Sequence, residues 1–125
     1  MLKKIFSIIF CVLSVPCYSK NKLPVVYGTI FLDADKIVFT IEQIGFSGPV
    51  YVTDYNLFFD ENNGIKNVYI TLYFTIRKSK KNLLIDNMKN GKKEIIIPRN
   101  DELKSENLMF FYKDDSNIIE LPIVN

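Results

Sequence analysis

Residues 68–77 read Val-Tyr-Ile-Thr-Leu-Tyr-Phe-Thr-Ile-Arg, and they decide the fold class of this chain. From Val68 onward every second residue is aliphatic or Phe, and the residues between them are Tyr, Thr or Arg. Strand side chains point alternately to two faces, so this period of two predicts a β-strand. Its apolar face needs a second layer to cover it, and we therefore expect the central strand of a β-sandwich.

Other extended stretches lie on both sides of this strand in the sequence. We expect strands at residues 25–32, 37–44, 50–59, 95–98, 108–113 and 118–124, with a shorter apolar segment at 83–85. Residues 101–104 have room for one helical turn. Gly28 predicts a β-bulge or a close approach of the backbone to a neighbour, and Pro122 predicts that the last strand is an edge strand. The apolar residues 57–59 are expected to turn into the core.

Seven or eight short strands with turn residues between them, and no amphipathic helix or repeat, predict one fold class. We expect an all-β protein, an antiparallel β-sandwich. The strand order resembles immunoglobulin-like domains in architecture: an apolar strand, a Gly-Pro loop into an aromatic strand, and a Tyr-bearing hairpin near the C-terminus. The Cys…Trp…Cys spacing of true immunoglobulin domains is absent, because the chain has no Trp.

Residues 1–19 have the build of a secretory signal peptide, and residues 20–125 are expected to form a single β-sandwich domain. Lys3 and Lys4 precede an apolar run that ends in a short polar segment at Ser19. This run is too short to span a bilayer, which disfavours a retained membrane anchor.

The residue before Cys17 is Pro16, where a lipidated cysteine requires a small residue, so we do not expect a lipoprotein. The predicted location is therefore secreted or periplasmic. A bacterial envelope is favoured because the chain has no Asn-x-Ser/Thr sequon despite its many asparagines.

The absence of two residue types restricts the chemistry of the mature chain. The sequence has no His, and its two cysteines, Cys11 and Cys17, leave with the signal peptide. Imidazole catalysis, Cys-based nucleophiles, the usual zinc sites and disulfides are thereby excluded. Every carboxylate is expected in a turn or on a solvent face, so we predict no enzyme and no cofactor.

The charge balance excludes two classes of partner. Lys and Arg number 16 and Asp and Glu number 14, so removal of Lys3 and Lys4 leaves 14 against 14. A neutral mature chain has no overall field for nucleic acid or for a membrane surface, and we predict neither as a partner.

Three acidic turns raise the question of calcium. They lie at residues 33–35, 60–64 and 114–117. Asp, Asn and Gly favour turns for backbone reasons alone, and the second turn has Thr71 where an EF-hand requires a bidentate Glu. We interpret all three as ordinary turns, with a composite cation site as the alternative.

The most suggestive surface feature is a set of Tyr and Thr residues at predicted outward positions of two strands. Tyr is enriched in recognition surfaces, although Tyr and Thr also stabilise a sheet by cross-strand pairing, and both interpretations stay open. The candidate binding face comprises Tyr51, Thr53, Tyr55, Tyr69, Thr71 and Tyr73, and the candidate basic loop comprises Arg77, Lys78, Lys80 and Lys81.

Two functions from different classes fit these observations. The first is a secreted or periplasmic module that binds and occludes a protein partner, as an inhibitor or an immunity protein does; here a monomer is expected. The second is a structural or assembly component of a surface appendage that acts by β-strand addition, through residues 25–32 or 118–124. The oligomeric state separates the two.

Overall fold

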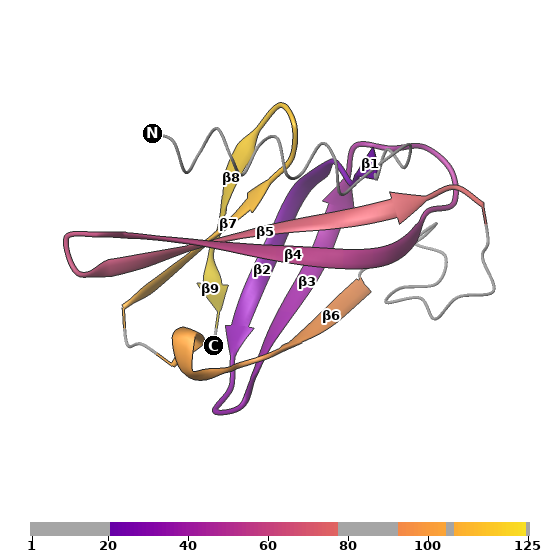
Figure 1. The fold of residues 1–125 in the computed structure, drawn as a ribbon. Coiled ribbons are helices and arrows are strands. Elements are labelled where there is room, and N and C mark those ends of the chain that lie inside the picture. Colours follow the sequence, from indigo (N-terminus) through magenta and orange to yellow (C-terminus); the bar gives the residue numbers. More distant parts are fainter. Residues whose placement is uncertain (1–20, 78–92, 105–106, 125) are drawn as a thin grey trace, which may run out of the picture.

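The computed structural model describes residues 21–77, 93–104 and 107–124, and almost all of their regular structure is β (Figure 1). The elements are β1 (Asn21–Lys22), β2 (Val25–Leu32), β3 (Lys36–Ile44), β4 (Tyr51–Asn62), β5 (Ile65–Thr75), β6 (Lys93–Pro98), the 3-10 turn η1 (Asp101–Leu103), β7 (Leu108–Lys113), β8 (Ile118–Leu121) and β9 (Ile123–Val124). The all-β prediction is confirmed. The predicted signal peptide with both cysteines and the apolar segment 83–85 lie outside the described residues.

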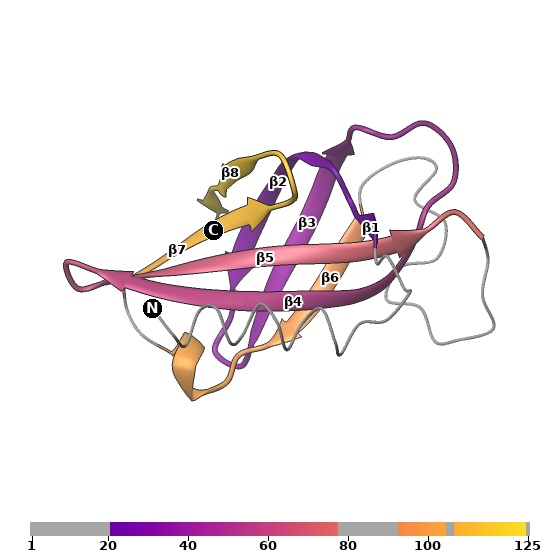
Figure 2. The same cartoon turned by 45° about the horizontal axis from the view of Figure 1, so that its top comes forward.

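The strands form two sheets that lie across one another (Figures 1 and 2). In the first, sheet A, β4 pairs with β5, β5 with β7, and β7 with β8, while β1 covers the end of β5 beyond β7. In the second, sheet B, the order is β6-β3-β2-β9. The chain moves back and forth between the sheets: hairpin β2–β3 lies in sheet B, hairpins β4–β5 and β7–β8 lie in sheet A, and β6 and β9 return to sheet B.

The prediction of purely antiparallel sheets is wrong for two pairings. Strand β5 runs parallel to β7, and β2 runs parallel to β9. Parallel neighbours need a crossover connection, and the path through the opposite sheet supplies one in each case. Immunoglobulin sheets are antiparallel, so these two pairings are a difference from the immunoglobulin strand pattern.

Pro122 divides the strand that was predicted at residues 118–124. Strand β8 precedes it in sheet A and β9 follows it in sheet B, and each is the terminal strand of its sheet. Pro has no N–H to donate, but its carbonyl accepts a hydrogen bond from the Ile30 N–H at 2.9 Å. The proline therefore marks the point where the chain changes sheets.

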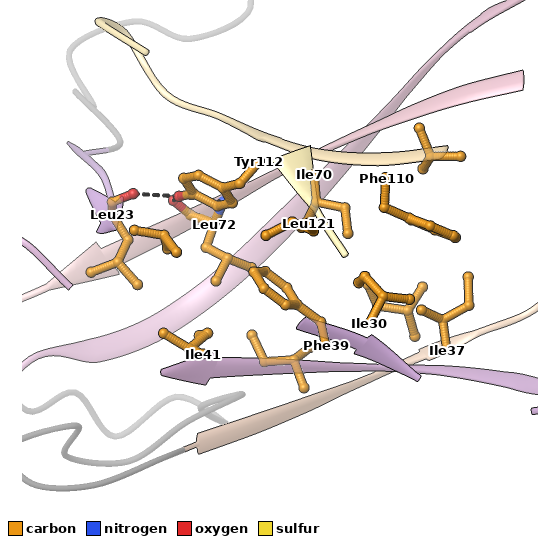
Figure 3. Close-up of a cluster of buried hydrophobic side chains, with 14 of the residues drawn as sticks. Leu23, Ile30, Ile37, Phe39, Ile41, Ile70, Leu72, Phe110, Tyr112 and Leu121 are labelled. Atoms are coloured by element: carbon orange, nitrogen blue, oxygen red, sulfur yellow. Dashed lines mark hydrogen bonds between the residues drawn. The ribbon is translucent and has the colours of Figure 1, made fainter. Parts of the chain in front are cut away.

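One hydrophobic core lies between the sheets (Figure 3). Strand β5 contributes Val68, Ile70 and Leu72, all 0% exposed, as the alternation predicted. The rings of Phe39 in sheet B and Tyr112 in sheet A have centroids 6.1 Å apart, which shows that the inner faces are in contact. This arrangement is consistent with the predicted β-sandwich.

Tyr112 joins three strands at a gap beside β5. Strand β7 covers one part of that side of β5 and β1 covers another, and Leu72 lies between them. The Leu72 N–H donates to the Tyr112 hydroxyl at 3.1 Å, the hydroxyl donates to the Leu23 carbonyl, and the Leu23 N–H donates to the Leu72 carbonyl at 2.8 Å. Burial raises the pKa of Tyr112, because the phenolate would lose its hydration.

Candidate functional site

A β-bulge in β4 decides which side chains share the outer face of sheet A. The register of β4 against β5 shifts between Val52 and Asp54, and Thr53 is the extra residue. Its hydroxyl donates to the Tyr73 carbonyl at 3.3 Å. Because one additional residue inverts the alternation, the residues of β4 after the bulge face opposite to the predicted direction.

The bulge brings part of the predicted binding face together and removes one member from it. Directly opposite residues of paired strands share a face, and Tyr51 lies opposite Thr75, on the face of Tyr69, Thr71 and Tyr73. Tyr55 lies opposite Leu72 and packs against the core, so its predicted outward position is wrong.

Some of the predicted face residues make structural contacts within the sheet. The Thr71 hydroxyl donates to the Lys113 carbonyl of β7 at 2.7 Å. Lys22 of β1 is opposite Tyr73, and its ammonium forms an ion pair with Asp115 at 2.8 Å. That hydrogen bond raises the pKa of Lys22, so a fixed positive charge lies beside Tyr73.

The centre of the outer face is a row of three aromatic rings, one from each of three adjacent strands. We call Phe58 of β4, Tyr69 of β5 and Phe111 of β7 the aromatic row. The centroids of Phe58 and Tyr69 are 6.0 Å apart, and those of Tyr69 and Phe111 are 5.2 Å apart with nearly parallel planes. The strand register places these residues opposite one another, Phe58 against Tyr69 and Tyr69 against Phe111.

Sequence reasoning missed two members of this row. Residues 57–59 were expected to turn into the core, but Phe58 is 61% exposed. Alternation within β7, where Leu108, Phe110 and Tyr112 are buried, was sufficient to place Phe111 outward. The position of Phe58 depends on the bulge, for which the sequence has no comparable signal.

The geometry of the row favours one kind of ligand. One face of the Tyr69 ring is stacked on Phe111, and Phe58 lies beside Tyr69 with its ring plane tilted by 46°, so the two neighbouring rings leave little room for a sugar or a base to stack on Tyr69. Phe58 has no aromatic neighbour on the side away from Tyr69 among the described contacts, and β4 is the outermost strand. The row therefore offers an apolar ridge that suits the side chains of another protein.

The remaining candidates are placed only in part. Arg77 is exposed just beyond β5, and its backbone N–H donates to the Thr75 hydroxyl at 3.2 Å. The other members of the basic loop, Lys78, Lys80 and Lys81, lie outside the described residues.

In residues 21–77, 93–104 and 107–124, no three His, Cys, Asp or Glu side chains lie close enough to hold a metal ion. That same part of the chain contains no helix with the length and hydropathy of a membrane span. A comparison with protein-family models, curated proteins and solved structures gave no match.

Proposed function

We propose that this protein is a non-enzymatic binding module, secreted or periplasmic after loss of residues 1–19, that occludes a protein partner with the outer face of sheet A. In this proposal the two sheets form a β-sandwich that acts as a rigid support, loosely immunoglobulin-like in shape. The aromatic row is the centre of the contact. Thr71, Tyr73 and Tyr51 continue the outer face from the row toward the end of β5.

The exposure of Phe58 is the observation that carries the proposal. The Phe58 side chain is large, apolar and 61% exposed. It adds little to the free energy of folding, because most of its surface stays in water. Aromatic side chains dominate the binding energy at the centres of protein interfaces. Contact with a partner would cover Phe58 and use the ordered Tyr69 and Phe111 rings at a small entropic cost.

The charges around the row suit a polar rim. Glu120 of β8 lies opposite Phe111, and Lys113 follows it two residues along β7. The Lys22–Asp115 ion pair adds charges of both signs near Tyr73. Rim charges of both signs raise the specificity and the association rate of a partner more than they raise its affinity.

The experiment is a capture of partners from envelope extract with three forms of the exported protein. The test variant is Phe58→Ala, and the control is Ile96→Ala on the outer face of sheet B, because Ile96 is 59% exposed and the two side chains are thus matched. We expect the wild type and Ile96→Ala to retain the same partner and Phe58→Ala to lose it. Equal recovery by all three forms would contradict the proposal.

The alternative function, assembly by strand addition, has support at one of the two expected edges, because residues 118–124 form the terminal strands β8 and β9, and at one further edge. Strand β2 lies between β3 and β9, and β9 pairs with Ile30 and Phe31, so part of the expected edge at residues 25–32 is covered. The further edge is β4, which is an edge strand of sheet A and has 12 residues, compared with 8 in β2.

A further inference from the structure

Strand β4 has one edge that no other described strand covers. It pairs with β5 along its whole length, from Tyr51 opposite Thr75 to Asn62 opposite Ile65. The described backbone hydrogen bonds outside the strand ladders include none from β4. Figure 2 shows β4 as the outermost strand of its sheet, on the side away from β7 and β8. Every second residue of such a strand directs its N–H and C=O outward, where another strand can pair with them.

The first part of this edge is closed by the chain itself. The Asp54 carboxylate accepts a hydrogen bond from the Tyr55 N–H at 2.8 Å, and the bulge at Thr53 interrupts the regular ladder just before it. Bulges and inward charges are devices that protect sheet edges. From Asn56 to Asn62 the register has no further shift. We call residues 56–61 the open edge.

The side chains of the open edge give it two different faces. Leu57 and Phe59 are partly buried against the core, and a strand added beside them would extend the apolar inner face. On the outer face Phe58 is exposed. An occupant therefore needs apolar residues at alternate positions, in the manner of β-augmentation.

The negative charge of β4 favours an occupant with basic residues. The sequence of β4 contains Asp54, Asp60 and Glu61 and no Lys or Arg, whereas residues 20–125 as a whole have 14 basic and 14 acidic residues. Asp60 and Glu61 are exposed at the end of the open edge. Opposite charges across paired strands stabilise the pair, and like charges destabilise it.

We propose that the open edge of β4 binds an extended segment of a partner protein that has alternating apolar residues and basic residues opposite Asp60 and Glu61. The ladder of main-chain hydrogen bonds supplies affinity, and the two carboxylates supply the preference for a basic strand. This site uses the backbone of β4 and shares Phe58 with the aromatic row, and protection of the backbone amides of residues 56–61 distinguishes it from a contact made by side chains of the outer face alone.

The test uses two synthetic peptides that alternate valine and threonine, one with two lysines and the other with two glutamates at the same positions. We expect the lysine peptide to bind the exported protein about five- to tenfold more tightly at low salt, and this ratio to shrink at about 0.5 M salt. Hydrogen exchange should show new protection at alternate amides of residues 56–61 in the complex.

Matched variants separate the edge from a general charge effect. Asp60→Asn with Glu61→Gln should abolish the preference for the lysine peptide and keep the amide protection. Asp35→Asn with Glu94→Gln, which changes the net charge equally at exposed sites away from β4, should leave the preference intact. Equal binding of both peptides to the wild type, or binding without protection of β4, would overturn the proposal. Protection of the same amides in a peptide-free dimer would assign the edge to a second copy instead and would also overturn it.

Discussion

At the scale of single residues, the two faces of β5 have different energetic roles. Leu72 is 0% exposed, and Leu72→Ala should lower the free energy of unfolding by about 2–5 kcal/mol through lost burial and the cavity left behind. Thr71→Ala loses one hydrogen bond, to the Lys113 carbonyl, and should cost only about 1 kcal/mol. Urea titrations of both variants measure the difference. Equal losses would mean that β5 is buried on both faces.

Tyr112 gives the fold a dependence on alkaline pH. A phenol whose pKa is higher in the folded state than its ordinary value of 10.0 adds stability that is complete below that value. Above about pH 10 the unfolded chain releases this proton and the folded chain retains it, so stability falls as the pH rises.

Tyr112→Phe tests this linkage. The variant loses the hydroxyl contacts to Leu23 and Leu72 and should be about 1–3 kcal/mol less stable at neutral pH. It should also lose less stability than the wild type between about pH 8 and pH 11, as measured by urea titration at each pH. The contribution of Lys22 is the same in both proteins and cancels. Parallel pH profiles would show that the Tyr112 hydroxyl is not shielded from water.

At the scale of elements, alternation predicted the inward residues of β5 and failed in β4 for a physical reason. Alternation of residue types predicts which face a side chain lies on only while the strand pairing stays regular. The extra residue at Thr53 moves every later side chain of β4 to the opposite face. Thr is an ordinary strand residue, so the sequence does not mark the bulge. Gly28 in β2 was recognisable as a bulge or close approach, because Gly weakens a strand unless space or conformation requires it.

The prediction at Gly28 is confirmed by both register and space. The register of β2 against β3 shifts next to Gly28, and a Cβ there would lie 2.8 Å from Phe39 Cε1 and 2.9 Å from the Thr40 carbonyl oxygen. We expect Gly28→Ala to cost about 1–3 kcal/mol of stability in a thermal or urea titration. Gly45→Ala is the control, since its Cβ would meet nothing closer than 3.5 Å, and it should change stability by less than about 0.5 kcal/mol. A tolerated Gly28→Ala would contradict the close packing of β2 on β3.

At the scale of the whole molecule, strand existence was predictable and sheet order was not. Local periodicity depends on neighbours along the chain, whereas the parallel pairing of β5 with β7 joins segments that β6 and η1 separate in the sequence. The exposed edge shows the same limit. Because residues 25–32 are apolar, they were predicted to be an edge available for strand addition. In the structure, β9 near the C-terminus pairs with part of β2.

Export of the protein is tested by its mass. The exported chain should lack residues 1–19 and start at Lys20, and it should show no sensitivity to reductant because both cysteines are removed. Intact-mass spectrometry of the protein from the envelope or medium measures this directly. A retained Met1, or the mass of a diacylglycerol on Cys17, would contradict the predicted signal peptide.

We propose that the inner faces of the two sheets stabilise the fold and that the outer face of sheet A binds a partner. The most direct test compares two free energies for Phe58→Ala: unfolding in urea, and binding of the captured partner by calorimetry. Because Phe58 is 61% exposed, we expect unfolding to change by less than about 1 kcal/mol and binding to weaken by about 2 kcal/mol or more. A variant that unfolds early and binds the partner with unchanged affinity would contradict the account.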